Sequence, residues 1–151
     1  MIVLSRVDSR LVHGQVIEAW LPHTKAERIL VVDDAAANDS IARAAMGLAL
    51  PDNVKLEVER VGEVDFAALS QDPVRTLVLF RDVASLLAAR ARGFFPASVN
   101  LGNVHAGPGR SAVSRSVFLS PDEVALLQEI KRAGAVVAAQ AIPQDAPVSV
   151  G

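Results

Sequence analysis

Short apolar runs alternate with helix-like segments along the whole chain, and this alternation constrains the fold more than any other feature. Strand-length apolar runs lie at residues 2–4, 29–32, 76–80 and 136–142. The run at 76–80 is apolar at almost every position, as expected of a central parallel strand. The pattern predicts an α/β fold: a doubly wound, mainly parallel central sheet with helices on both faces.

The remaining segments fit the same plan. Strands are also predicted at residues 54–61 and 113–119, and helices at about 39–50, 63–69, 82–92 and 120–132. At the start of the last helix Ser120 can be the N-cap, Pro121 fits the first helical position and Glu123 completes a capping box. Residues from Pro143 onward are expected to form a tail. Without repeats or a linker, residues 1–151 are expected to be a single domain.

Composition excludes several classes of function. The net charge is −2, and basic residues are not interleaved with aromatic ones, which argues against nucleic-acid binding. The absence of cysteine excludes disulfides, thiolate metal sites and cysteine nucleophiles. The first residues lack the basic region and the long apolar segment expected of a signal peptide, and no apolar run reaches the roughly 20 residues that a membrane span needs. We therefore expect a soluble protein, in keeping with a cytoplasmic enzyme.

The stretch between the first strand and the first helix carries the strongest chemical signal. It holds Arg6, Asp8, Arg10 and His13, and Gly14 follows at the expected start of the helix. Ligands of doubly wound sheets bind beyond the carboxyl ends of the strands, and free N–H groups at a helix start attract anions. His13 could act as a nucleophile there. On residue chemistry alone, a lone histidine near a turn is more often a cap, a core hydrogen-bond partner or a surface residue.

Other candidate sites are weaker. Asp33 and Asp34 resemble the acidic pair that binds magnesium in response-regulator receivers, but no lysine ends a later strand, so a capping role is favoured. The three histidines, at 13, 23 and 105, do not have metal-ligand spacing. His23 is expected to be solvated, and Trp20 to pack in the core.

The glycine-rich stretch at residues 102–110 (Gly102–Arg110) predicts a surface loop. It matches neither the dinucleotide-binding pattern nor a Walker A sequence. His105 and Arg110 remain candidates to face a partner or ligand.

The stretch Asp8-Ser9-Arg10-Leu11-Val12-His13-Gly14-Gln15-Val16 closely resembles the signature loop of the IIB components in the mannose/sorbose family of the bacterial sugar phosphotransferase system (PTS). Residues 29–34, 99–102 and 117–142 resemble further segments of that family. Asn103 is a departure, because many members carry a second glycine there.

The resemblance implies a phosphocarrier, and hence a phosphotransferase. His13 would accept a phosphoryl group on Nδ1 from a IIA phosphohistidine and pass it to a sugar held by the membrane components IIC and IID. Arg10 would clamp the phosphoryl oxygens, and the amides of Gly14 and Gln15 would be further donors. The scheme requires no metal and no organic cofactor.

Asp8, Arg6 and Ser9 are assigned orienting or docking roles, Asp8 towards Arg10 or the imidazole and Arg6 towards the docking surface. Leu11, Val12 and Trp20 are candidates for that surface, although the sequence does not separate them from the core. The resemblance is compatible with a homodimer and with a peripheral position at the inner face of the membrane through IIC and IID. The alternative is a regulatory phospho-binding module of the same fold, without sugar transfer.

Overall fold

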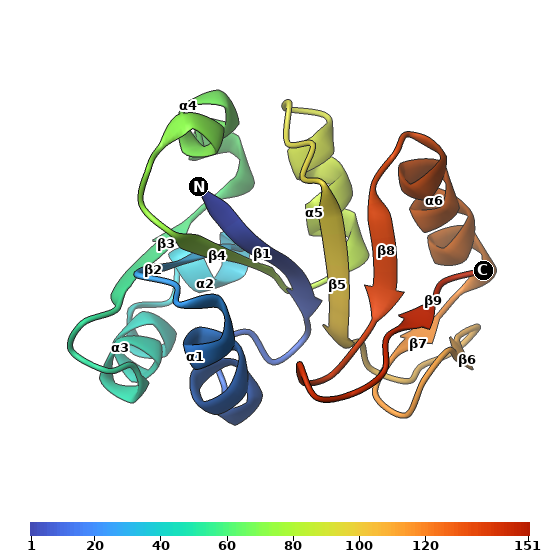
Figure 1. The fold of residues 1–151 in the computed structure, drawn as a ribbon, viewed down its shortest axis with the longest axis horizontal. Coiled ribbons are helices and arrows are strands. Elements are labelled where there is room, and N and C mark those ends of the chain that lie inside the picture. Colours follow the sequence, from blue (N-terminus) through green and yellow to red (C-terminus); the bar gives the residue numbers. More distant parts are fainter.

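A seven-stranded sheet forms the centre of the molecule. The computed structural model describes all residues, 1–151. The strands of the sheet are β1 (Ile2–Asp8), β2 (Arg28–Val32), β3 (Lys55–Glu59), β4 (Thr76–Phe80), β5 (Ser98–Asn103), β8 (Val136–Ala139) and β9 (Val148–Ser149). They lie side by side in the order β3-β2-β4-β1-β5-β8-β9 (Figure 1). Only the β8–β9 pair is antiparallel, which confirms the predicted α/β fold with a mainly parallel sheet.

Helices cover both faces of this sheet. They are η1 (Gln15–Trp20, a π-helix), α1 (Leu21–Thr24), α2 (Asp34–Ala37), α3 (Ser40–Ala49), η2 (Val61–Glu63, a 3₁₀ turn), α4 (Phe66–Gln71), α5 (Val83–Arg90) and α6 (Pro121–Arg132). Neighbouring residues of a strand point to opposite faces, so the sheet supports two separate cores. One core of 22 buried residues includes parts of α4, α5 and α6, and the other, of 11, includes parts of η1, α1 and α2.

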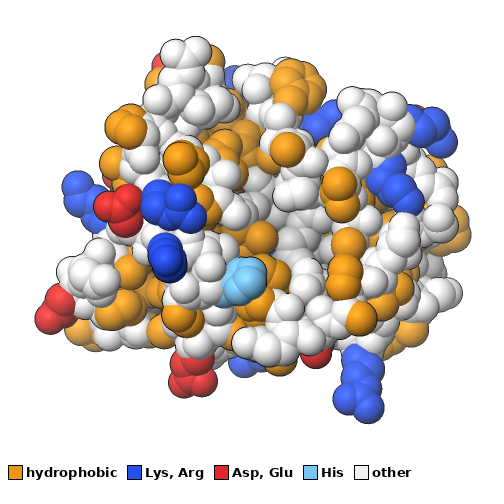
Figure 2. All heavy atoms as spheres, viewed as in Figure 1, with side chains coloured by type: hydrophobic (Ala, Val, Ile, Leu, Met, Phe, Trp, Pro, Cys, Tyr) orange, Lys and Arg blue, Asp and Glu red, His pale blue; other side chains and the backbone are white.

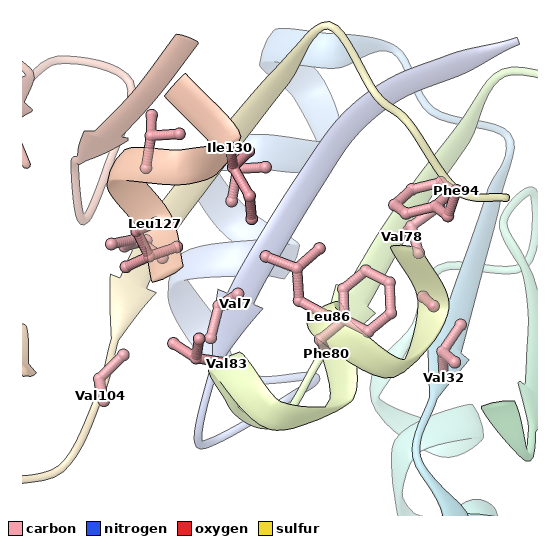
Figure 3. Packing of buried hydrophobic residues seen from close by; sticks show 14 of the residues in the cluster. Val7, Val32, Val78, Phe80, Val83, Leu86, Phe94, Val104, Leu127 and Ile130 are labelled. Atoms are coloured by element: carbon pink, nitrogen blue, oxygen red, sulfur yellow. The ribbon is translucent and has the colours of Figure 1, made fainter. Parts of the chain in front are cut away.

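The larger core shows how a helix packs on the central strands. Figure 3 shows Val83 and Leu86 of α5 beside Val7 of β1 and Phe80 of β4. All four side chains are at most 1% exposed. All five residues of β4 are buried, which agrees with the prediction of a central strand. β1 lies between β4 and β5.

Three local predictions differ from the structure. Residues 113–119 do not form one strand, because the amides of Val113 and Ser114 bond to the carbonyl of Val117 and close a turn. The flanking residues form a small antiparallel pair, β6 (Ser111–Ala112) and β7 (Phe118–Leu119). The predicted tail contains β9, which pairs with β8, and the short helix α2 was not anticipated.

The capping signals were read correctly. Ser120 accepts a hydrogen bond from the amide of Glu123, and the Glu123 side chain accepts one from the amide of Ser120. The predicted capping box is therefore confirmed, with Pro121 as the first residue of α6.

No helix of the chain is long and apolar enough to cross a membrane. Figure 2 shows charged side chains of both signs on one face, separated by hydrophobic and uncharged atoms. This face therefore has no continuous basic surface of the kind that follows a nucleic-acid backbone.

Candidate phosphoacceptor site

The loop after β1 leaves the middle of the sheet and leads into η1. Its sharpest point is Leu11, whose φ of 55° is rare for a branched side chain. The amide of Leu11 donates to the carbonyl of Asp8 over 3.0 Å, and its side chain is 4% exposed within the smaller core. Strained backbone of this kind persists only where surrounding contacts hold it. The anchored Leu11 thereby fixes the path of the chain towards His13.

A buried ion pair lies beneath this loop. The side chains of Arg6 and Asp8 are both 0% exposed, and Nε and Nη2 of Arg6 lie 3.0 Å from Oδ2 of Asp8. Nη1 of Arg6 donates to Oδ1 of Asn100 (2.7 Å) and to the carbonyl of Gln140 (3.1 Å). The guanidinium also lies over the Trp20 ring, 5.4 Å from its centroid. Arg6 is thus held by β1, β5, η1 and the end of β8.

Glycine at position 102 makes room for this arginine. A Cβ atom at Gly102 would overlap the guanidinium of Arg6. The two residues meet because β5 runs parallel to β1, with Arg6 opposite Asn100 and Asp8 opposite Asn103. The same pairing therefore brings both asparagines to the loop.

His13 is bound to the ion pair through one ring nitrogen. Nε2 of His13 lies 2.7 Å from Oδ2 of Asp8. Burial by itself raises the pKa of Asp8, but the His13 hydrogen bond, the charge of Arg6 and the Asn103 amide together hold that pKa below its ordinary value. An ionised carboxylate only accepts hydrogen bonds, so Nε2 carries the proton. In the neutral imidazole Nδ1 then has the free lone pair. This atom is buried without a hydrogen-bond partner.

Asn103 and Gln15 complete the network. Nδ2 of Asn103 donates to Oδ2 of Asp8 (3.0 Å) and to Oε1 of Gln15 (2.9 Å). Nη2 of Arg6 donates to the same oxygen of Gln15 over 3.3 Å. A side chain from the start of η1 is thereby tied to the ends of β1 and β5.

A pocket of about 380 Å³ opens beside His13. Its lining consists of Arg10, His13, Gly14, Gln15, Glu18, Ala19 and Ile142. Arg10 is exposed, and its guanidinium makes no hydrogen bond within the chain, whereas its amide donates to Oδ1 of Asp8 over 2.9 Å. The amides of Gly14 and Gln15 have no backbone acceptor. Unpaired donors and one free cation around an imidazole suit a tetrahedral anion.

Comparison with known proteins identifies the family. The family model described as "PTS system sorbose subfamily IIB component" matches residues 2–151.

The chain belongs to this family. PTS IIB components of the mannose/sorbose family are phosphocarriers and phosphotransferases, and they work with IIA and IIC/IID components. The family therefore gives the chain its class of activity.

Three relatives illustrate the similarity of this IIB chain. It is 28% identical over 152 residues to the sorbose-specific EIIB component of Klebsiella pneumoniae, covering 99% of this chain and 92% of that protein. The solved N-acetylgalactosamine-specific IIB component 1 of Escherichia coli is 26% identical, with a TM-score of 0.89 and full coverage of both chains. The mannose-specific EIIAB component of Escherichia coli K12 is 26% identical over 138 residues, covering 89% of this chain and 42% of that protein.

The predicted site residues of this IIB component mostly converge. Asp8 contacts both the imidazole of His13 and the amide of Arg10, as the orienting assignment anticipated. The docking role given to Arg6 is wrong, because its side chain is fully buried. Ser9 donates its amide to the carbonyl of Asn103 over 2.8 Å, and its hydroxyl is buried without a partner.

Of the residues considered for a docking surface, two belong to the core. Leu11 and Trp20 are each 4% exposed, and Nε1 of Trp20 donates to the carbonyl of Ala141. Val12 is half-buried. His23 is exposed, as predicted, and packs edge-on against Trp20.

Sequence reasoning missed three residues of the network: Asn100, Asn103 and Gln140. Asn100 lies within β5, Asn103 is its last residue and Gln140 directly follows β8, all far along the chain from the His13 loop. The sequence singles out Asn103 only as a departure from glycine. The asparagine that ends β5 was the available signal, because polar side chains at the carboxyl edge of a parallel sheet lie near the ligand site.

The acidic pair Asp33 and Asp34 is explained by contacts within the chain. Asp33 caps α2 through the amide of Ala36 and binds Arg81, and Asp34 accepts the amide of Val61. This is the capping role that was favoured. Side chains of His, Asp and Glu form no group that could hold a metal ion.

The loop at residues 102–110 is fastened to α6. Nε and Nη2 of Arg110 bind the two carboxylate oxygens of Glu123, at 3.0 and 3.1 Å. Nη1 donates to the carbonyl of His105. Arg110 therefore has a structural partner in Glu123, while His105 is exposed.

Proposed function

We propose that His13 is the phosphoryl-accepting residue of this IIB component and that Nδ1 is the accepting atom. The supporting observation is the hydrogen bond of 2.7 Å between Nε2 and the buried Asp8, which leaves the lone pair of Nδ1 unused. Nδ1 is covered in the free chain. A donor protein therefore has to displace the covering atoms when it docks.

The chemistry follows from this tautomer. The lone pair of Nδ1 attacks the phosphorus of the donor phosphohistidine, the donor P–N bond breaks, and a new P–N bond forms on His13. The His13 ring then carries a proton on Nε2 and the phosphoryl group on Nδ1, so it is an imidazolium. The carboxylate of Asp8 stabilises that positive charge, in the way that a buried aspartate supports a catalytic histidine. When a sugar hydroxyl attacks the phosphorus, the P–N bond breaks, neutral His13 leaves and the hydroxyl proton is released to water or to a base at the sugar site.

The surrounding donors suit the phosphoryl oxygens. Arg10 is exposed and free within the chain, so it can clamp the negative charge. The amides of Gly14 and Gln15 are further donors at the same pocket. In phosphoryl transfer, catalysis is mostly positioning and charge stabilisation, which is what these groups offer.

The proposed partners are a IIA phosphohistidine protein as donor and a sugar held by IIC/IID as acceptor. The relative named mannose-specific EIIAB component carries both IIA and IIB in its name. This supports a IIA protein as the donor. The reaction would take place at the cytoplasmic face of the membrane. The relatives carry the names of different sugars. We propose that the membrane partner, and not this chain, selects the sugar.

Phosphoryl transfer tests the proposal directly. The wild type and His13→Ala would each be incubated with isotopically labelled, phosphorylated native IIA, with His23→Ala and His105→Ala as controls at exposed histidines. We expect one phosphoryl group in the wild type and both controls and none in His13→Ala. NMR of the labelled protein should place it on Nδ1. A folded His13→Ala protein that still takes one equivalent would overturn the proposal.

The same phosphorylated protein separates transport from regulation. Membrane vesicles that contain the native IIC and IID components and candidate sugars would be added to it. Transfer of the label to a sugar is expected. Label that stays on the protein with every sugar tested would favour the regulatory module.

A further inference from the structure

Asn103, the last residue of β5, donates both of its side-chain amide protons to hydrogen bonds inside the phosphoacceptor site. Nδ2 donates to Oδ2 of Asp8 over 3.0 Å and to Oε1 of Gln15 over 2.9 Å. An amide nitrogen has two protons, so this donor capacity is fully used. The β1–β5 register, with Asp8 opposite Asn103, sets the position of the side chain.

The first hydrogen bond bears on the tautomer of His13. Oδ2 of Asp8 accepts from Arg6, Asn103 and the imidazole together. Arg6 approaches from within the sheet, whereas Nδ2 of Asn103 lies beside the ring, 3.5 Å from Nε2 of His13. The two donors hold Oδ2 of Asp8 within hydrogen-bond distance of Nε2, and Nδ1 is left as the nitrogen with the lone pair.

The second hydrogen bond bears on the orientation of Gln15. Its Oε1 atom accepts from both Asn103 and Arg6, so the oxygen of the amide is directed inward. Nε2 is then the outward atom, and it makes no hydrogen bond within the chain although Gln15 lines the pocket beside His13. A Gln15 amide turned in this way offers an N–H group to an anion at His13.

We propose that Asn103 is a positioning residue of this site: its two hydrogen bonds fix His13 with Nδ1 as the accepting nitrogen and turn the Gln15 amide nitrogen towards the incoming phosphoryl group. The inference rests on the proposed role of His13. Glycine at position 103 would remove one hydrogen-bond donor from Asp8 and one from Gln15. Aspartate would place a second carboxylate about 3 Å from Asp8, where like charges repel.

The test uses Asn103→Ala, with Ser116→Ala as the matched control. The hydroxyl of Ser116 donates to the carbonyl of Gly102 over 2.7 Å, so this variant also removes one hydrogen bond at the end of β5 but leaves Asp8, Gln15 and His13 untouched. The tautomer of His13 would be measured from the ¹⁵N shifts of its ring in unphosphorylated protein. Phosphoryl transfer from native IIA and thermal unfolding would be measured on the same samples.

We expect the minor His13 tautomer to rise about tenfold in Asn103→Ala, as for the loss of one hydrogen bond to a charged group. Transfer should also slow about tenfold, because the Gln15 amide is no longer held towards the phosphoryl group. Ser116→Ala should leave both unchanged. Asn103→Asp has nearly the same volume and should show the same loss. If Asn103→Ala does not fold, Asn103→Ser takes its place in the test, because serine retains one donor. We then expect a tautomer population and a transfer rate between those of the wild type and those expected for Asn103→Ala.

A wild-type tautomer and rate in the folded variants would overturn the inference, even if thermal stability fell. The tautomer measurement does not depend on phosphorylation. A shifted tautomer in Asn103→Ala together with a wild type that accepts no phosphoryl group would therefore refute the proposed function and retain the positioning role.

Discussion

Two aspartates lie at the carboxyl ends of strands in the central sheet, and their side chains have similar hydrogen-bond and ion-pair partners. Asp8 is the last residue of β1, and Asp33 directly follows β2. Each binds an arginine, Arg6 or Arg81, and each accepts a backbone amide two or three residues further on. From these contacts alone the two sites are alike.

The difference lies in burial and in what else the carboxylate holds. Asp8 and Arg6 are both 0% exposed, and Asp8 also binds His13 and Asn103. Arg81 is 41% exposed, and Asp33 binds only this arginine and the amide of Ala36. The comparison teaches that an aspartate–arginine pair becomes a candidate catalytic element when it holds a titratable side chain with an unused lone pair. The Asp33–Arg81 pair holds no such side chain, and Asp33 only caps α2 beside the sheet.

The largest stability effect is expected from Asp8→Asn. The substitution removes the only carboxylate beside a fully buried arginine, so the free energy of unfolding should fall by about 3–5 kcal/mol. Denaturant unfolding measures it. A loss below about 1 kcal/mol would mean that the other partners of Arg6 compensate for its charge, and would erase the contrast with Asp33.

Gly102→Ala should have the next largest effect. The new Cβ atom would overlap the Arg6 guanidinium, which the surrounding hydrogen bonds hold in place, so a loss of about 1–3 kcal/mol is expected from overpacking. Thermal or denaturant unfolding gives the value. Gly47→Ala in α3 is the control, because its Cβ would meet only Leu56 at 3.8 Å. Equal stability of the two variants would show that Arg6 can move aside.

Asp33→Asn makes the same chemical change at the second site and should have the smallest effect. Asparagine caps a helix about as well as aspartate, and the lost ion pair involves a partly exposed arginine, so the cost should stay below about 1 kcal/mol. Phosphoryl transfer to His13 should be unchanged. Slower transfer with intact stability would indicate that the Asp33 end of the sheet also contributes to the site.

Much of the fold could be predicted from the sequence because the signals are local. The apolar run at 76–80 and the capping box at 120–123 depend only on residues near one another in the chain, and both are confirmed. The short hairpin at 111–119 and the strand β9 were not predicted, because two-residue strands carry no periodicity and are defined by their partners.

The candidate site divides in the same way. The His13 loop was recognisable as one continuous motif, and its residues do lie close together. The docking role predicted for Arg6 was wrong. The burial of Arg6 could not be inferred, because it depends on Trp20, Gly102 and Gln140 closing around the guanidinium.

The sequence by itself determined the strand–helix alternation, the helix caps and the chemistry available at the His13 loop, since each is encoded by neighbouring residues. Only the tertiary structure decided which groups contact the His13 ring and its partner Asp8. Asn103 lies 95 residues from Asp8 along the chain. The two meet because the parallel β5 packs beside β1, and that pairing is a property of the whole sheet.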